Sequence, residues 1–127
     1  MLDYKTEIQK NEKIQRLEAR IRDKGDMKEV QLLATETGKI MAKVIGSNLE
    51  EQYPNGQIAD EDVRAIVSPV MKANHAYVSE LAAVAINMMY EKAGVGLKAV
   101  IPEYSTYRET GIVWKIANRS FKDGFYR

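Results

Sequence analysis

The chain has 127 residues, the length of one compact domain whose core needs no covalent cross-links. It contains no cysteine, which excludes a disulfide framework and any thiolate metal site. Its 19 basic and 18 acidic side chains nearly cancel, so no whole-molecule field attracts nucleic acid or an acidic membrane. No apolar run is long enough to span a bilayer, and we expect a soluble protein without a secretory signal.

Residues 1–24 are predicted to form a charged amphipathic helical arm. Ile14, Leu17 and Ile21 recur at three- and four-residue steps and form a short heptad-like seam among charges of both signs. A helix with so little to bury pairs with a copy of itself, lies against a partner or projects from the domain, and the pattern leaves these alternatives open. We therefore count Ile14, Leu17 and Ile21 as candidate interface residues.

A second helix is predicted from Asp26 to about Tyr53. Gly25 is expected to end the helix before it, and Asp26 followed by Glu29 is typical of a capping box at a helix start. Apolar and small residues then recur at helical spacing, so one face of this helix is expected to be buried. The stripe consists of Val30, Ala34, Thr37, Met41 and Val44.

A turn is predicted at residues 53–56, because the sequence Tyr-Pro-Asn-Gly combines residues that favour turns. Asp60 is then expected to cap a short helix. That helix is expected to end before Pro69, since the residue preceding a proline is pushed out of the helical region. The following helix would thus be entered through a bend.

The longest apolar-patterned stretch, residues 68–94, is predicted to be the central buried helix. Ser68 and Pro69 are typical of a helix start, and Gly94 is typical of a left-handed helix end. Its apolar face is too wide for a helix that lies on the surface. The two apolar rows are Val70, Ala73, Tyr77, Leu81, Val84 and Met88, and beside them Val78, Ala82, Ala85 and Met89.

An extended connection is predicted around residues 95–104, with Val100 and Ile101 packed on the core, and a last helix is predicted over roughly 107–121. The expected fold is therefore all-α. It is a small bundle of four to five helices in which the arm at 1–24 precedes a helical domain at 26–127.

No group of residues in the sequence indicates catalysis. His75 is the only histidine, and its helical position at the edge of the apolar face favours a structural or surface role. The carboxylates near the predicted turn are interpreted as solvated groups and helix caps. We expect no enzyme activity, no catalytic, cofactor-binding or metal-ligating residues, no cofactor and no small-molecule substrate.

The C-terminal segment from Tyr104 has an uneven composition, because six of the ten aromatic residues lie there among five basic and two acidic residues. Aromatic residues with arginine are typical of protein interfaces, which is the favoured interpretation. Ordinary core and surface positions, or stacking on single-stranded nucleic acid, are the alternatives. The candidate interface residues here are Tyr107, Arg108, Trp114, Arg119, Phe121, Phe125 and Tyr126.

The run from Ala93 to Val113 resembles a segment of head-region structural proteins of tailed bacteriophages of Gram-positive hosts, the minor capsid or portal-associated proteins. There a helical part leads into a stretch of the form AGxGxK…PE…R…GI. The resemblance covers roughly residues 35–117. That family continues into a domain with cysteine and histidine, whose activity is not carried over to this cysteine-free chain. The matching positions are Ala93, Gly94, Gly96, Lys98, Pro102, Glu103, Arg108, Gly111 and Ile112.

The resemblance implies a structural or assembly protein of the virion, located at the head or head-to-tail region and assembled in the host cytoplasm. The expected partners are other virion proteins, such as the capsid or portal, and copies of the chain itself. A membrane is not expected as a partner. The alternative function is that of a small helical regulatory or nucleic-acid-binding protein, and nucleic acid is the less favoured partner.

Overall fold

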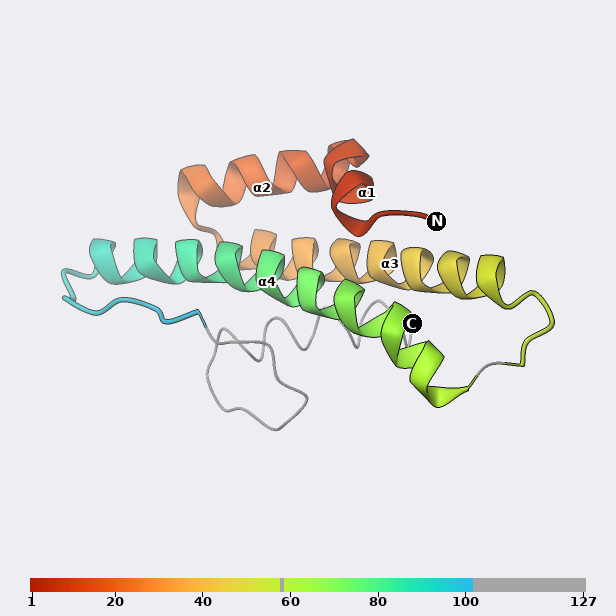
Figure 1. Ribbon diagram of the computed structural model, residues 1–127. Coiled ribbons are helices and arrows are strands. Elements are labelled where there is room, and N and C mark those ends of the chain that lie inside the picture. Colours follow the sequence, from red (N-terminus) through yellow and green to blue (C-terminus); the bar gives the residue numbers. More distant parts are fainter. Residues whose placement is uncertain (58, 102–127) are drawn as a thin grey trace.

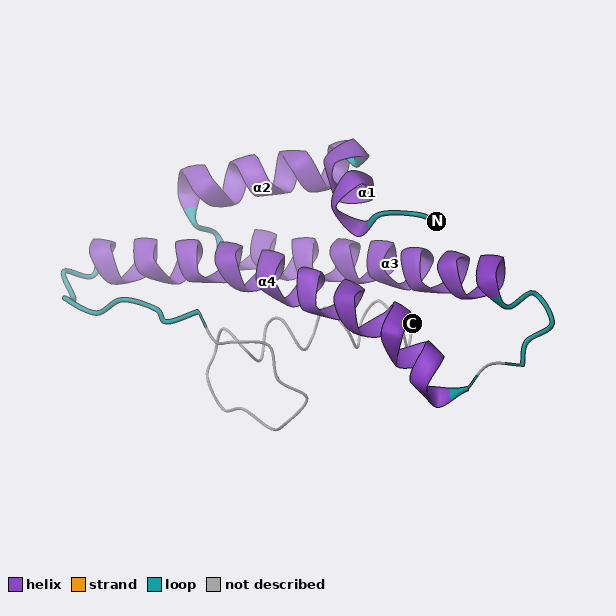
Figure 2. Cartoon of the chain, viewed as in Figure 1, coloured by secondary structure: helices purple, strands orange, loops and turns teal. Residues whose placement is uncertain are grey.

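The computed structural model describes residues 1–57 and 59–101. Over these ranges the chain forms four helices and no strand (Figures 1 and 2). Helices α3 and α4 run antiparallel along each other, and α1 and α2 lie across one side of that pair. The predicted all-α helical bundle is thus confirmed. The helices are α1 (Tyr4–Lys10), α2 (Glu12–Lys24), α3 (Met27–Gln52) and α4 (Asp60–Lys92).

Residues 1–24 do not project as an arm. They form two helices separated at Asn11, whose side-chain oxygen accepts a hydrogen bond from the Ile14 amide at 3.0 Å and so starts α2. Both helices pack on α3 and α4. The seam residues Ile14, Leu17 and Ile21 are at most 1% exposed within the single chain. Their predicted role as an intermolecular seam is corrected accordingly, because α3 and α4 already cover them.

Ion pairs cross between the N-terminal helices and α3 at three levels. Lys43 Nζ lies 3.0 Å from a carboxylate oxygen of Glu7, and Lys13 Nζ lies 3.0 Å from Glu36. Arg20 pairs with Glu29 at 3.1 Å. The basic partner in each pair is largely exposed, so these contacts add little free energy and mainly fix how α1 and α2 lie on α3.

Gly25 makes the corner between α2 and α3, as predicted. Its φ of 67° lies in the left-handed region. A Cβ placed on it would lie 2.9 Å from both Cβ and Sδ of Met88 on α4. Only glycine therefore allows α2 to end this close to α4.

The start of α3 follows the predicted cap only in part. The Asp26 carboxylate accepts a hydrogen bond from the Lys28 amide at 2.8 Å, which satisfies one free donor of the first turn. Glu29 instead forms the ion pair with Arg20 of α2, across the corner between α2 and α3. The helix then continues without a break to Gln52.

Helix α4 continues through Pro69, so the predicted short helix and break at this position are wrong. The N-cap is Ala59, without a side-chain cap, and not Asp60. Pro69 lacks one helical hydrogen bond, and the axis of α4 bends away from α3 toward its N-terminal end (Figure 1). Ile66 and Val70 on either side are buried, and their packing holds the helix together across the proline.

The central position of α4 is confirmed. Its buried face, however, is centred closer to the second predicted row of apolar residues than to the first. Ala73 is exposed, whereas Val78, Ala82 and Ala85 of the second row are fully buried. Met89, at the end of that row, is 48% exposed. The core between α2, α3 and α4 is built mainly from Leu17, Ile21, Leu33, Met41, Val44, Val78 and Leu81.

Candidate functional site

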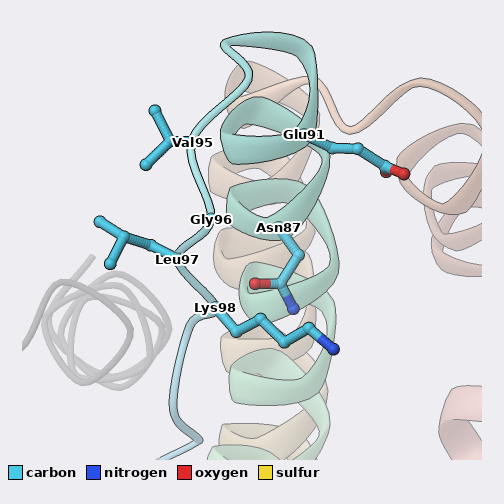
Figure 3. Close-up of a pocket in the computed structure, with 6 residues that line it drawn as sticks. All are labelled: Asn87, Glu91, Val95, Gly96, Leu97 and Lys98. Atoms are coloured by element: carbon cyan, nitrogen blue, oxygen red, sulfur yellow. The ribbon is translucent and has the colours of Figure 1, made fainter.

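The candidate site is the segment that follows α4, residues 95–101, which we call the return segment. Gly94 has a φ of 69°, its amide donates to the Glu91 carbonyl at 3.1 Å, and the Val95 amide donates to the Tyr90 carbonyl at 2.9 Å. This pair of bonds is a Schellman motif, and it confirms the predicted cap at Gly94. It reverses the chain, so that the return segment runs back along α4 (Figure 3).

The return segment presents apolar side chains to solvent. The exposed fractions are 42% for Val95, 61% for Leu97, 82% for Val100 and 51% for Ile101. The prediction that Val100 and Ile101 pack on the core is therefore wrong. Figure 3 shows Val95 and Leu97 pointing to the same side, away from α4. Several adjacent apolar side chains in solvent are typical of a surface that another molecule covers.

Two contacts fix the return segment in place. The Asn87 side-chain oxygen on α4 accepts a hydrogen bond from the Ala99 amide at 2.6 Å. The Ala99 side chain packs against the hydrophobic core. Together with the Schellman bonds, these contacts hold the segment at both ends, so its apolar side chains stand on a defined backbone.

A pocket of ≈ 470 Å³ lies between the return segment and the last turns of α4 (Figure 3). The polar residues that line it are Asn87, Glu91 and Lys98, and Figure 3 shows the Glu91 carboxylate directed away from the return segment. The lining residues are Asn87, Glu91, Val95, Gly96, Leu97 and Lys98.

Polar side chains also connect the helices inside the bundle. The Tyr4 hydroxyl donates to the Asn74 side-chain oxygen at 2.7 Å, and the Tyr77 hydroxyl donates to Glu18 at 2.5 Å. Arg22 bridges Glu18 and Glu80, at 3.3 and 3.2 Å. Desolvation by burial raises the pKa of both tyrosines, so both stay neutral donors. These groups join α1 and α2 to α4.

His75 lies on α4 and is 7% exposed, which makes it a buried residue. Burial lowers the pKa of its imidazole because the charged form is poorly solvated there. In the ranges 1–57 and 59–101, no three His, Asp or Glu side chains come together as metal ligands. Within the same ranges, no helix has the length and apolar character to cross a membrane.

The predicted interface residues divide into two groups. Ile14, Leu17 and Ile21 are inside the bundle, as described above. The C-terminal group lies outside the described residues, and so does the predicted helix at 107–121. This group is Tyr107, Arg108, Trp114, Arg119, Phe121, Phe125 and Tyr126. Sequence reasoning missed that the return segment is exposed. The sequence does contain one signal for it, which is the glycine cap at Gly94 that reverses the chain.

Comparison of the chain with protein-family models, with curated proteins and with solved structures gives no match. The similarity to phage head proteins therefore stays a prediction from the Ala93–Val113 run alone.

Proposed function

We propose that this protein is a non-enzymatic structural or assembly component of a bacteriophage virion that acts through protein–protein contacts. The observation that carries the proposal is the exposed apolar return segment, in which Leu97 and Val100 are 61% and 82% exposed. It is held on a rigid helix by hydrogen bonds at Val95 and Ala99. A fixed apolar strip on a helical bundle is suited to binding another protein surface.

The return segment falls inside the run that resembles phage head proteins. Gly94 in that run is explained by the fold, because its φ of 69° suits glycine. Leu97, Lys98 and Val100 are exposed and contribute nothing to the core. The stability of the bundle does not require these three residues. A contact with another virion protein would use them.

The partners that fit this proposal are the capsid or portal proteins of the head or head-to-tail region, met during assembly in the host cytoplasm. A regulatory or nucleic-acid-binding role is the alternative. The two functions require different binding surfaces, because a surface that binds nucleic acid needs several basic side chains. The return segment has one, Lys98, among four exposed apolar side chains.

The test of the proposal is the location of the chain in purified phage particles, by mass spectrometry of the particles and by imaging with an antibody to the chain. We expect the protein in mature heads or in assembly intermediates. Its absence from both, in infected cells that contain it, would falsify the virion assignment.

A second measurement addresses the contact surface. Val100→Asp is expected to reduce the binding of the purified protein to purified capsid or portal protein, because it places a charge in the apolar strip. Leu32→Asp is the matched control, since Leu32 is also an exposed apolar residue, 51% exposed, but lies on α3. Equal binding by the two variants would rule out the return segment as the contact.

A further inference from the structure

The turn after α3 contains an asparagine followed by a glycine, Asn55 and Gly56, which the proposed function does not use. The Gly56 amide donates to the Tyr53 carbonyl at 3.0 Å, so residues 53–56 form the β-turn that the sequence predicts. Asn55 and Gly56 are both exposed. The turn lies at the end of the α3–α4 pair opposite to the one where α4 ends (Figure 1), so it is separate from the return segment.

The side chain of Asn55 is free, in contrast to the other asparagines of the described ranges. It makes no hydrogen bond with any residue in 1–57 or 59–101, so its exposed carboxamide can rotate. Each of the others accepts a hydrogen bond at its side-chain oxygen, at 2.6–3.0 Å, which fixes its carboxamide. These fixed residues are Asn11, Asn48, Asn74 and Asn87.

The residue after Asn55 also sets it apart. Gly56 has no side chain that could hinder an approach to its own amide nitrogen. A Cβ placed on Gly56 would meet nothing within 4 Å, so no other part of the described chain crowds this position. The four fixed asparagines are instead each followed by a residue with a side chain, namely Glu12, Leu49, His75 and Met88.

We propose that Asn55 is a site of spontaneous deamidation, with water as the co-reactant. Hydroxide removes the proton of the Gly56 amide, and the nitrogen then attacks Cγ of Asn55. The new N–Cγ bond closes a succinimide ring, the Cγ–Nδ2 bond breaks, and Nδ2 leaves as ammonia after it takes a proton from water, which restores the hydroxide. Water opens the ring at either carbonyl and gives aspartate or isoaspartate. One water is consumed, one ammonia is released, and nothing is oxidised or reduced.

One contact opposes the ring closure, because the Gly56 amide must first leave the Tyr53 carbonyl. This bond lies in an exposed turn, where water can replace it at little net cost in free energy. Local opening of such a turn requires much less free energy than unfolding of the bundle. We therefore expect the reaction to take place in the folded protein.

Deamidation changes the charge of the molecule. The product carries a carboxylate, so the formal net charge of +1 falls to zero, a condition that favours association of protein molecules. The new charge also joins a connection whose flanks are already acidic and exposed. The acidic residues on either side of it are Glu50, Glu51, Glu61 and Asp62.

The test is peptide mass spectrometry of the folded full chain after incubation at mildly alkaline pH in water enriched in heavy oxygen. We expect the Asn55 peptide to replace NH2 by OH with one heavy oxygen, and the peptides of the four fixed asparagines to stay unchanged. An unchanged Asn55 peptide would overturn the proposal, as would an equal rate at any of the four. A reaction that takes place in urea and not in the folded chain would overturn it as well.

Two variants test the chemistry. Gly56→Ala is expected to slow the reaction severalfold, because the methyl group hinders the attacking nitrogen, and circular dichroism shows whether the helices are retained. Asn55→Gln keeps the carboxamide and the turn glycine but would need a larger ring, so it should also react severalfold more slowly. If both variants reacted as fast as the wild type, attack by the Gly56 nitrogen would be excluded.

Discussion

At the scale of single residues, Gly25 shows how one position joins two parts of the bundle. It combines a left-handed backbone with close contact to Met88. Gly25→Ala is expected to lower the free energy of unfolding by about 1–3 kcal/mol, because the added methyl group overlaps Met88 and the backbone is strained. Gly46→Ala is the control. This exposed α3 glycine has no neighbour within 4 Å of a new Cβ, and alanine there should add about 1 kcal/mol.

Urea unfolding of both variants measures the difference. Two glycine-to-alanine changes in one chain are thus expected to have opposite signs. A Gly25→Ala variant as stable as the wild type would mean that α2 can move away from Met88 without loss of packing.

The buried tyrosines Tyr4 and Tyr77 make stability depend on alkaline pH. Burial raises the pKa of both phenols above the ordinary value of 10.0. Above that pH the unfolded chain loses these protons while the folded chain keeps them, so the free energy of unfolding falls as pH rises. Their contribution is fully present below about pH 10 and is lost progressively above it.

Urea unfolding from neutral pH to about pH 11 is the measurement for the tyrosines. Lysines titrate in the same range, so the informative quantity is the difference between wild type and variant. Tyr4→Phe and Tyr77→Phe should each make the alkaline decline less steep, and the double variant should do so most. If the double variant declined as steeply as the wild type, the two phenols would not be responsible.

At the scale of elements, Pro69 shows how packing overrides a local signal. It lies inside α4, where it removes one helical hydrogen bond and accompanies a bend. Pro69→Ala restores the amide donor on an exposed face and is expected to raise the free energy of unfolding by up to roughly 3 kcal/mol. Pro54→Ala, in the turn after α3, should instead lower it by about 0.4–1 kcal/mol, because the unfolded chain becomes less restricted. Thermal unfolding distinguishes the two signs. A loss of stability in Pro69→Ala would show that the bend is needed to bury Ile66 and Val70.

The helix ends were predictable because their signals are local. Gly25, Asp26 and Gly94 act through backbone conformation or a cap within a few residues, and the structure places all three as the sequence indicates. The continuity of α4 through Pro69 was not predictable. It depends on side chains of other helices around Ile66 and Val70, and the local pattern contains nothing about them.

The candidate site illustrates the same limit. Periodicity shows which side of a segment is apolar, but not what covers that side. The seam at Ile14, Leu17 and Ile21 was correctly seen as apolar, and its cover proved to be the chain itself. For Val100 the opposite error occurred, since a β-branched residue after a buried helix suggests core, yet the reversal at Gly94 leaves it in solvent.

At the scale of the whole molecule, the N-terminal helices belong to the same folding unit as α3 and α4. Their buried side chains occupy the core together with those of the two long helices. If residues 1–24 were instead a separate arm, shortening the side chains of its seam would leave the stability of the remaining chain unchanged. The distinction can be measured with one pair of matched substitutions.

Leu17 and Leu32 are the same residue type in opposite environments, 1% and 51% exposed. Leu17→Ala is expected to lower the free energy of unfolding by about 2–5 kcal/mol, because it leaves a cavity between α2 and the long helices. Leu32→Ala, on the exposed face of α3, should change it by less than about 0.5 kcal/mol. Urea unfolding followed by circular dichroism at several protein concentrations is the measurement.

The concentration series separates the two explanations for a buried seam. If Leu17 is covered by its own chain, the loss in Leu17→Ala is the same at every protein concentration, because no second chain takes part in that contact. If the seam were covered by another copy, the loss would grow as the protein is concentrated, since mass action would then stabilise only the wild type. We expect the first result, because α3 and α4 of the same chain already bury Leu17.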